Sequence, residues 1–248
     1  MSRTETTTRH ILGLDLGKRQ DPSSLVTAEH RRTIETSVNY RHTGQRRQPK
    51  VDSSVSEEVK QSAFSVVRID RFSLGTEYRD VAETTRRVME SPKTKAPTLV
   101  LDANGVGDAV TEILKDVGVS PVPIYTTGGR EVNREGGSWS VPKAEVVSAL
   151  QVLLQDGRLD IAEGLDLADQ LITEMKAFSV RYTDAGNVRF EHSGEGHHGD
   201  TVIALALACW YGESAATQGP RSAVSGRSRD RNSVRSIREE RRHLIRNR

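Results

Sequence analysis

The sequence lacks the features of disulfide-bonded, zinc-thiolate and membrane-spanning proteins. Cys209 is its only cysteine in 248 residues, so neither an intrachain disulfide nor a cluster of zinc thiolates can form. No apolar run approaches the roughly 18 residues that a membrane span needs. The first ten residues also lack the apolar core of a signal peptide. We therefore expect a soluble protein of a reducing cytoplasm, with no membrane partner.

Neither sign of charge dominates the chain, but the two signs are unevenly distributed. The net charge is +2, whereas residues 219–248 hold ten arginines against three acidic residues, which leaves the preceding 218 residues at −5. A basic tail on a mildly acidic body favours contact with a polyanion such as nucleic acid. The low apolar content of residues 216–248 is equally typical of a disordered, solvated tail. Both interpretations of this tail stay open.

Apolar periodicity predicts one folded domain over residues 10–215. Its first part has the runs and alternation of three strands in an antiparallel meander, at residues 10–16, 24–28 and 63–72. Its later part alternates helical patterns with short buried strands and ends in a hairpin and a helix. The helices are predicted at residues 78–89, 107–117, 142–155, 165–178 and 200–212, the strands at 97–102, 121–125 and 159–161, and the hairpin at 178–192.

This order of elements predicts the α/β class. We expect a mixed β-sheet, with three antiparallel strands followed by parallel strands, flanked by helices. Residues 1–9 are predicted to be a flexible N-terminus, and the polar residues 41–60 an exposed insertion. Residues 126–138 are predicted to form a glycine-rich loop.

Three aspartates follow or begin apolar elements in a way that suggests a divalent-metal site. Asp15 and Asp102 each end an apolar strand, and Asp200 begins the Ala-rich helix that follows His197-His198-Gly199. A buried carboxylate is costly unless something pairs with it. Oxygen ligands without thiolates suit Mg²⁺ or Mn²⁺, and two such ions can catalyse phosphodiester hydrolysis.

Other interpretations of these residues remain open. Asp15 and Asp102 could each be an ordinary aspartate in a strand-end turn. A zinc hydrolase built on His192, His197, His198 and Asp200 is a further alternative, although no His-Glu-x-x-His spacing supports it. The glycines after Asp102 do not complete a P-loop, and nothing else in the sequence matches one. A nucleotide-hydrolysing motor is therefore not encoded in these residues.

Taken together and in order, five stretches resemble the nuclease domain of viral large terminase subunits, which cut concatemeric DNA during genome packaging. The resemblance covers residues 10–214 and is carried by residues 12–17 with 21–23, 71–78, 99–107, 141–155 and 197–208. It implies an RNase H-like fold and a metal-dependent endonuclease. Carried over by position, Asp15, Asp102 and Asp200 are the metal-binding aspartates, and His197 is the histidine beside the last of them.

The resemblance also has implications for partners and for the rest of the site. Where relatives often have a further acidic residue, this chain has Gly199, so the second of two metal ions lacks one ligand. Large terminases usually carry an ATPase ahead of the nuclease, and these 248 residues hold none, so the ATPase is either a separate subunit or was removed by truncation. We expect a separate ATPase subunit, a small terminase and a portal as partners, in the cytoplasm of the infected host cell. Double-stranded DNA is the expected substrate, and its candidate contacts are Lys143, Arg130, Arg227, Arg229 and Arg231.

Two alternative functions use the same features differently. A structure-selective junction resolvase would share the RNase H-like fold and would favour a symmetric dimer. A non-catalytic DNA-binding packaging or assembly subunit would use the basic tail as its functional part. Cleavage assays distinguish both from the endonuclease.

Overall fold

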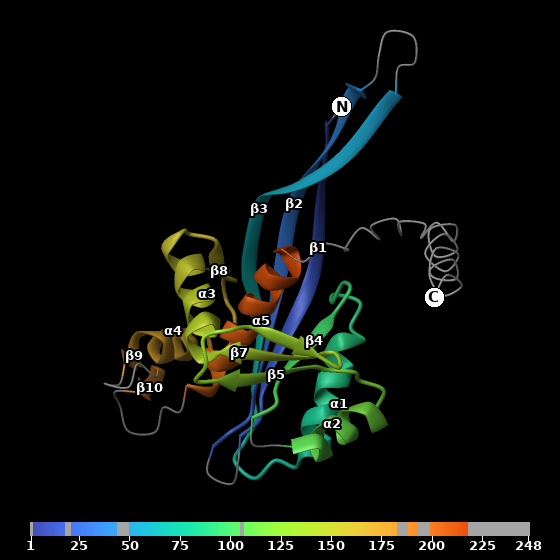
Figure 1. Cartoon of the computed structure of the whole chain (residues 1–248). Helices are drawn as coiled ribbons and strands as arrows, with labels where there is room; N and C mark the ends of the chain where they lie inside the picture. The colour runs from blue at the N-terminus through green and yellow to red at the C-terminus, as the bar shows by residue number, and fades with distance from the viewer. Residues whose placement is uncertain are drawn as a thin grey trace, which may run out of the picture. The chain divides into compact units, whose positions relative to one another are not determined.

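A mixed eight-stranded sheet lies at the centre of the fold (Figure 1). The computed structural model describes residues 2–17, 21–43, 50–104, 107–182, 188–192 and 199–217. The strand order is β6-β7-β5-β4-β1-β2-β3-β8, and a separate hairpin pairs β9 (Phe178–Tyr182) with β10 (Val188–His192). The predicted α/β class is therefore confirmed.

The first three strands form the predicted antiparallel meander, and they are much longer than the sequence pattern indicates. β1 (Ser2–Asp15) pairs with β2 (Ser24–Thr43), which pairs with β3 (Lys50–Arg71). We refer to residues 31–43 and 50–63, where β2 and β3 extend as a long hairpin, as the arm.

Two predictions about this region are wrong. Residues 2–9 are not a flexible N-terminus, because they pair with β2 along their whole length. The predicted insertion at 41–60 contains the end of β2 and the first half of β3, while residues 44–49 lie outside the described residues. Polar side chains on both faces of these strands leave no apolar alternation, so the pattern that reveals a half-buried strand is missing.

The later elements follow the predicted order. β4 (Thr98–Asp102), β5 (Val122–Thr127) and β7 (Ser138–Pro142) continue the sheet from β1 as parallel strands, and β8 (Leu159–Ile161) is parallel to β3. The helices are α1 (Tyr78–Met89), α2 (Gly107–Asp116), α3 (Lys143–Gln155), α4 (Ala168–Ala177) and α5 (Asp200–Thr217). The prediction of a loop over residues 126–138 is wrong in part. This segment contains the short strand β6 (Asn133–Glu135), which pairs with β7.

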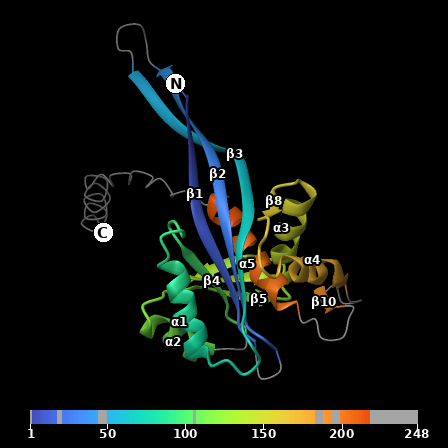
Figure 2. The same ribbon diagram turned by 180° about the vertical axis from the view of Figure 1, so that it is seen from behind.

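The alternation of β1 divides the apolar core between the two faces of the sheet. Leu12 and Leu14 belong to a cluster with side chains of α1 and α2. Ile11 belongs to the other cluster, which includes side chains of α3, α4 and α5. Figures 1 and 2 show α1 and α2 together, apart from α3, α4 and α5. The alternating pattern of β1 thus buries both faces of the central sheet.

Helix α5 packs directly on the central strands. Residues 204–209 of α5 are fully buried. A Cβ atom on Gly13 would lie 1.8 Å from the carbonyl oxygen of Ala204, so β1 accepts the helix only because residue 13 has no side chain. At the other end of the contact, a Cβ atom on Gly212 would lie 2.5 Å from the ring of Phe64, so this position of α5 also requires glycine. Despite its apolar sequence, neither α5 nor any other helix of the described ranges could span a membrane.

A buried polar network joins the base of the arm to the last turns of α5. Arg9 donates from Nε to Nδ1 of His30 at 3.2 Å, and Nε2 of His30 lies 2.8 Å from Oγ of Ser62. Ser62 donates in turn to Glu213 at 2.5 Å, and Arg158 donates to the other carboxylate oxygen of Glu213 at 3.0 Å. Because Nδ1 of His30 accepts, its neutral ring carries the proton on Nε2 and donates to Ser62.

Candidate metal and nuclease site

Two aspartates lie side by side at the carboxyl edge of the sheet. β1 and β4 are parallel, and Leu14 pairs with Leu101, so Asp15 and Asp102 follow at the ends of adjacent strands. Alternation places both on the same face as Ile11 and Val100, which is the face that α5 covers. Ligands of open α/β sheets bind at this edge.

Helix α5 brings the third predicted aspartate to the same edge. Asp200 is the first residue of α5, one turn before the Ala204 carbonyl that contacts Gly13. Thr201 Oγ1 lies 3.2 Å from Oγ of Ser24, the partner of Asp15 on β2. The predicted convergence of Asp200 with the strand ends thus follows from the close packing of α5 on β1.

Gly199 has a backbone reason to be glycine. Its φ is +68°, and the residue is buried immediately before α5. L-residues with a side chain rarely adopt this left-handed conformation. An acidic side chain at position 199 would therefore be strained. Glycine permits the left-handed turn from which α5 begins at Asp200.

The charges of the other carboxylates act on Asp15 at this edge of the sheet. Burial raises the pKa of the Asp15 carboxyl well above its ordinary value. The charges of Asp102, Asp200 and Asp21, in that order of size, raise this pKa further. A half-buried carboxylate with three like charges nearby is destabilised in its ionised form, and a bound cation would reverse that balance.

Asp21 is a further carboxylate near Asp15 that the predicted site did not include. It follows β1 in a turn that is held by hydrogen bonds: Ser23 Oγ accepts from the Gly17 backbone N–H at 3.1 Å, and Tyr78 Oη donates to the Gly17 carbonyl at 3.1 Å. A Cβ on Gly17 would collide with the Asp21 carbonyl oxygen at 1.9 Å. The Asp-Pro-Ser stretch was part of the family resemblance, and it was the available signal.

Asp102 is oriented by its own turn. Its Oδ1 accepts a hydrogen bond from the Asn104 backbone N–H at 2.9 Å. The Asn104 side chain donates to the Thr126 carbonyl at 3.0 Å and also to the Thr126 hydroxyl, which ties the turn after β4 to β5. Such an Asx turn fixes the direction of the carboxylate.

A buried ion pair lies at the same edge of the sheet. Arg71 ends β3 and pairs through Nη1 with Oε1 of Glu174 on α4 at 2.6 Å. Glu174 is fully buried and also accepts from Gln170 at 3.0 Å, whereas its Oε2 makes no hydrogen bond to a described residue. Arg71 pairs with Ser24 on β2, so a cation stands two strands away from Asp15.

The chemistry of this donor set fits a hard divalent cation. It consists of carboxylate oxygens on separate elements, and no cysteine is near, since Cys209 is buried within α5 and burial raises the pKa of its thiol. Within the described ranges, no three histidine, cysteine or acidic side chains lie close enough to form a complete metal cluster. The fit to a divalent cation therefore rests on the chemical type of the carboxylate oxygens and on the like charges that raise the pKa of Asp15.

The remaining predicted site residues fall into two groups. Lys143 begins α3 directly after β7, and the exposed Arg130 lies in the β5–β6 loop, so both follow parallel strands at the same edge as Asp102. The structure therefore brings them to the carboxyl edge of the sheet. The others lie outside the described residues: His197, His198, Arg227, Arg229 and Arg231.

Comparison with solved structures identifies the fold. The large terminase nuclease from thermophilic phage G20c is 20% identical over 81% of this chain and 81% of that chain, with a TM-score of 0.52. Its structure with bound magnesium is 20% identical over 82% of this chain and 80% of that chain, with a TM-score of 0.51. No known family profile and no curated protein sequence matches the chain. The protein therefore has the RNase H-like fold of large terminase nucleases.

Proposed function

We propose that this protein is a metal-dependent DNA endonuclease that cuts concatemeric viral DNA during genome packaging. The observation that carries the proposal is the group of carboxylates at one sheet edge, in which the charges of Asp102, Asp200 and Asp21 all raise the pKa of half-buried Asp15. The likeness to a nuclease whose structure holds magnesium supports the same conclusion. Mg²⁺ or Mn²⁺, in two sites, is the proposed cofactor.

Each residue of the site has a proposed role. Asp15 and Asp102 would hold the ions from the strand ends, and Asp200 would close the site from α5. When bound, the ions would lower the pKa of an attacking water and stabilise the leaving oxygen of the phosphodiester. Asn104 keeps the Asp102 carboxylate directed toward the site. We propose that His197 accepts a proton from the water or positions it.

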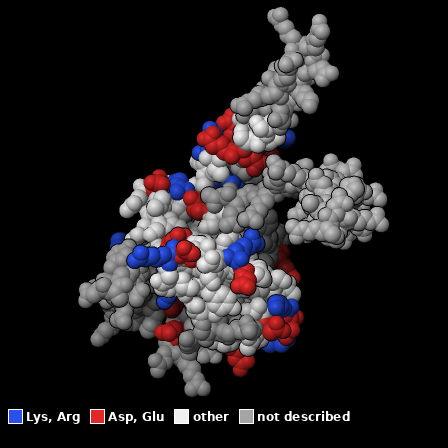
Figure 3. Space-filling view, viewed as in Figure 1, with Lys and Arg blue, Asp and Glu red and all other residues white. Residues whose placement is uncertain are grey.

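The proposed DNA contacts are electrostatic. Lys143 and Arg130 would contact phosphates beside the carboxylates, and the tail residues Arg227, Arg229 and Arg231 would add affinity without sequence preference. On the face shown in Figure 3, charges of both signs are interspersed over the described residues. The arginine excess of residues 219–248 is therefore the main concentrated positive charge in the sequence.

The proposed partners follow from the proposed activity. Double-stranded DNA is the substrate, and a terminase ATPase, a small terminase and a portal are the proposed protein partners, in the cytoplasm of the infected host cell. The 248 residues contain no P-loop, so the hydrolysis of ATP would come from outside them.

Plasmid nicking tests the proposal. We expect the purified protein to nick and linearise supercoiled plasmid with Mg²⁺ or Mn²⁺ and not with EDTA. Asp102→Ala and Asp102→Asn should lower the rate by at least about a thousandfold, because the metal loses a ligand that positions it. Asp116→Asn, an exposed aspartate at the end of α2, is the matched control and should retain full activity.

Three outcomes would contradict the proposal in different ways. Absence of cleavage with either metal at any salt concentration would favour a non-catalytic assembly subunit. Full activity of Asp102→Asn would place the chemistry elsewhere. Preference by orders of magnitude for four-way junctions over linear duplex would favour a junction resolvase.

A further inference from the structure

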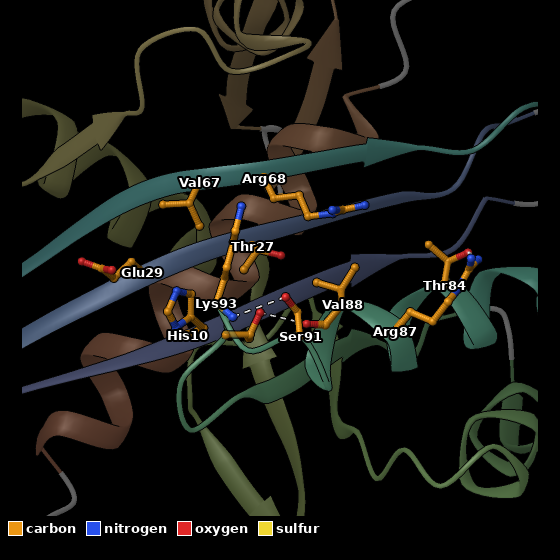
Figure 4. A pocket seen from close by; sticks show the side chains of 11 residues that line it. His10, Thr27, Glu29, Val67, Arg68, Thr84, Arg87, Val88, Ser91 and Lys93 are labelled. Carbon is orange, nitrogen blue, oxygen red and sulfur yellow. Dashed lines mark hydrogen bonds between the residues drawn. The ribbon is translucent and has the colours of Figure 1, made fainter.

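A polar cavity of about 570 Å³ lies on the face of the sheet opposite α5, away from the carboxylate site. It is bounded by β1, β2 and β3 on one side and by α1 and the loop after α1 on the other (Figure 4). His10, which lines it, precedes Asp15 by five residues of extended strand, or roughly 16 Å. The cavity is therefore separate from the proposed nuclease site.

The cavity wall carries positive charge that no ion pair compensates. Within the described residues, Arg87 and Lys93 form no ion pair, and Arg87 donates only to the Glu83 carbonyl and the Thr84 hydroxyl. The other charged residues of the wall are paired, Arg68 with Asp70 at 2.6 Å and Glu29 with Arg31 at 3.0 Å. Two cations are thus available to a ligand.

Two neutral hydrogen-bonding groups of the wall lack partners among the described residues. Thr27 is 2% exposed, and its hydroxyl makes no hydrogen bond. Nδ1 of His10 contacts the Lys95 backbone, 2.9 Å from its N–H and 3.3 Å from its carbonyl oxygen, whereas Nε2 has no hydrogen-bond partner among the described residues. Figure 4 shows the Lys93 side chain crossing the cavity from the loop toward the strands, beside Thr27. Buried polar groups usually have partners, so the unpaired hydroxyl in the cavity wall is available to hydrogen-bond a ligand.

We infer that this cavity binds a phosphate-bearing ligand of about the size of a mononucleotide. Two uncompensated cations match the charge of a phosphomonoester, and the hydroxyl and imidazole supply further donors. The volume falls within the usual range for small-molecule sites. Val67 and Val88 add apolar surface for the remainder of the ligand. A free nucleotide and the terminal phosphate of a nucleic-acid strand share this chemistry.

Calorimetric titration tests the inference. The probes are inorganic phosphate, thymidine 5′-monophosphate and thymidine, added in EDTA to the full chain carrying Asp102→Asn, so that neither metal nor cleavage contributes. We expect the monophosphate to bind and thymidine not to bind. Arg87→Gln and Lys93→Gln should each weaken binding by about tenfold or more, because each removes a charge-assisted contact. Arg86→Gln is the matched control, since Arg86 pairs with Glu83 and Glu90 and does not line the cavity.

Thr27→Val separates ligand binding from folding. Because the hydroxyl is unpaired, valine of similar shape should leave the melting temperature unchanged or higher, yet weaken the monophosphate severalfold. A 5′-phosphorylated oligonucleotide that binds more tightly than the free nucleotide would identify a strand end as the ligand, and the reverse order would identify the nucleotide. The inference is overturned if the monophosphate does not bind, or binds all variants equally. Neither result depends on nuclease activity.

Discussion

Asp15 combines partial burial with the like charges of three other aspartates, a combination that costs stability wherever no cation is bound. Replacing it with asparagine removes the charge and keeps the shape. In EDTA we expect Asp15→Asn to raise the free energy of unfolding by about 0.5–2 kcal/mol, as is common when strain at a functional site is relieved. Urea denaturation measures this change.

The same variant should lose the stabilisation that metal provides. Added Mn²⁺ should raise the unfolding midpoint of the wild type and not that of Asp15→Asn. Asp116→Asn again serves as the control and should follow the wild type in both conditions. Destabilisation of Asp15→Asn in EDTA would show that Asp15 has a structural partner instead of a ligand.

His30 makes stability depend on pH in a defined window. Burial, together with the smaller effect of the charges of Arg9 and Arg32, lowers its pKa from 6.5 to about 3. Its ring stacks on Phe64 at 4.3 Å and stays neutral in the folded protein. Between pH 6.5 and 3 the unfolded chain therefore binds a proton that the folded chain does not, so stability falls as pH falls, by up to about 1.4 kcal/mol per pH unit.

His30→Gln checks this dependence. Urea denaturation from pH 7 to pH 5 should give a shallower loss of stability for the variant than for the wild type, although glutamine lowers stability at every pH. Parallel curves would show that His30 titrates alike in the folded and unfolded chains. His10→Gln, on the other face of the sheet, gives a comparison for the loss of a second buried imidazole.

At the scale of elements, the β1–α5 contact sets the position of Asp200. Gly13→Ala would put a methyl group 1.8 Å from a backbone oxygen that cannot rotate away. We expect a loss of at least about 2 kcal/mol in the free energy of unfolding, together with a lower nicking rate, because α5 carries Asp200. Gly129→Ala is the control: its nearest neighbour would be the Thr127 hydroxyl at 3.4 Å, so stability should change little. Equal stability of both variants would contradict the close packing.

Elements with a clear apolar face could be predicted from the sequence. α1 was predicted at its observed bounds because its apolar residues follow one helical stripe. The arm could not be predicted, since its strands are held by pairing with each other and with β1 instead of by an apolar core. β6 was missed because three polar residues between glycines carry no period.

The candidate site was predictable for the same reason that its elements were. Asp15 and Asp102 end apolar strands that a parallel sheet brings together, and Asp200 begins the apolar helix that packs on β1. Asp21 lies in a turn without a period, and its approach to Asp15 arises only when the chain folds back beside Gly17. His197 remains a prediction, because it lies outside the described residues.

At the scale of the whole molecule, we expect residues 1–217 to carry the nuclease activity and residues 218–248 to add affinity for DNA. Residues 1–217 should fold without residues 218–248, since the strands and helices described end at Thr217. We expect this truncation to keep the melting temperature and to weaken DNA binding at low salt. The slope of log affinity against log salt should become shallower by several units, because each phosphate contact contributes about 0.9.

Fluorescence anisotropy with a labelled duplex measures this slope. Nicking by the truncated protein should persist at low salt, since the carboxylates belong to the body. An unchanged slope would assign the tail to a protein partner instead of DNA. Charge reversal of Arg227, Arg229 and Arg231 in the full chain would then show whether the effect of the truncation comes from the charge of the tail or from its length.

The burial of Cys209 has a practical consequence for following this protein in solution. The only thiol of the chain lies within α5, and burial raises its pKa, so maleimide reagents have no reactive native target. A cysteine introduced at Glu57, on the exposed arm, would be the single labelled position without any prior removal of native cysteines. A spin label or fluorophore at that position would report directly on the arm as DNA or a partner protein binds.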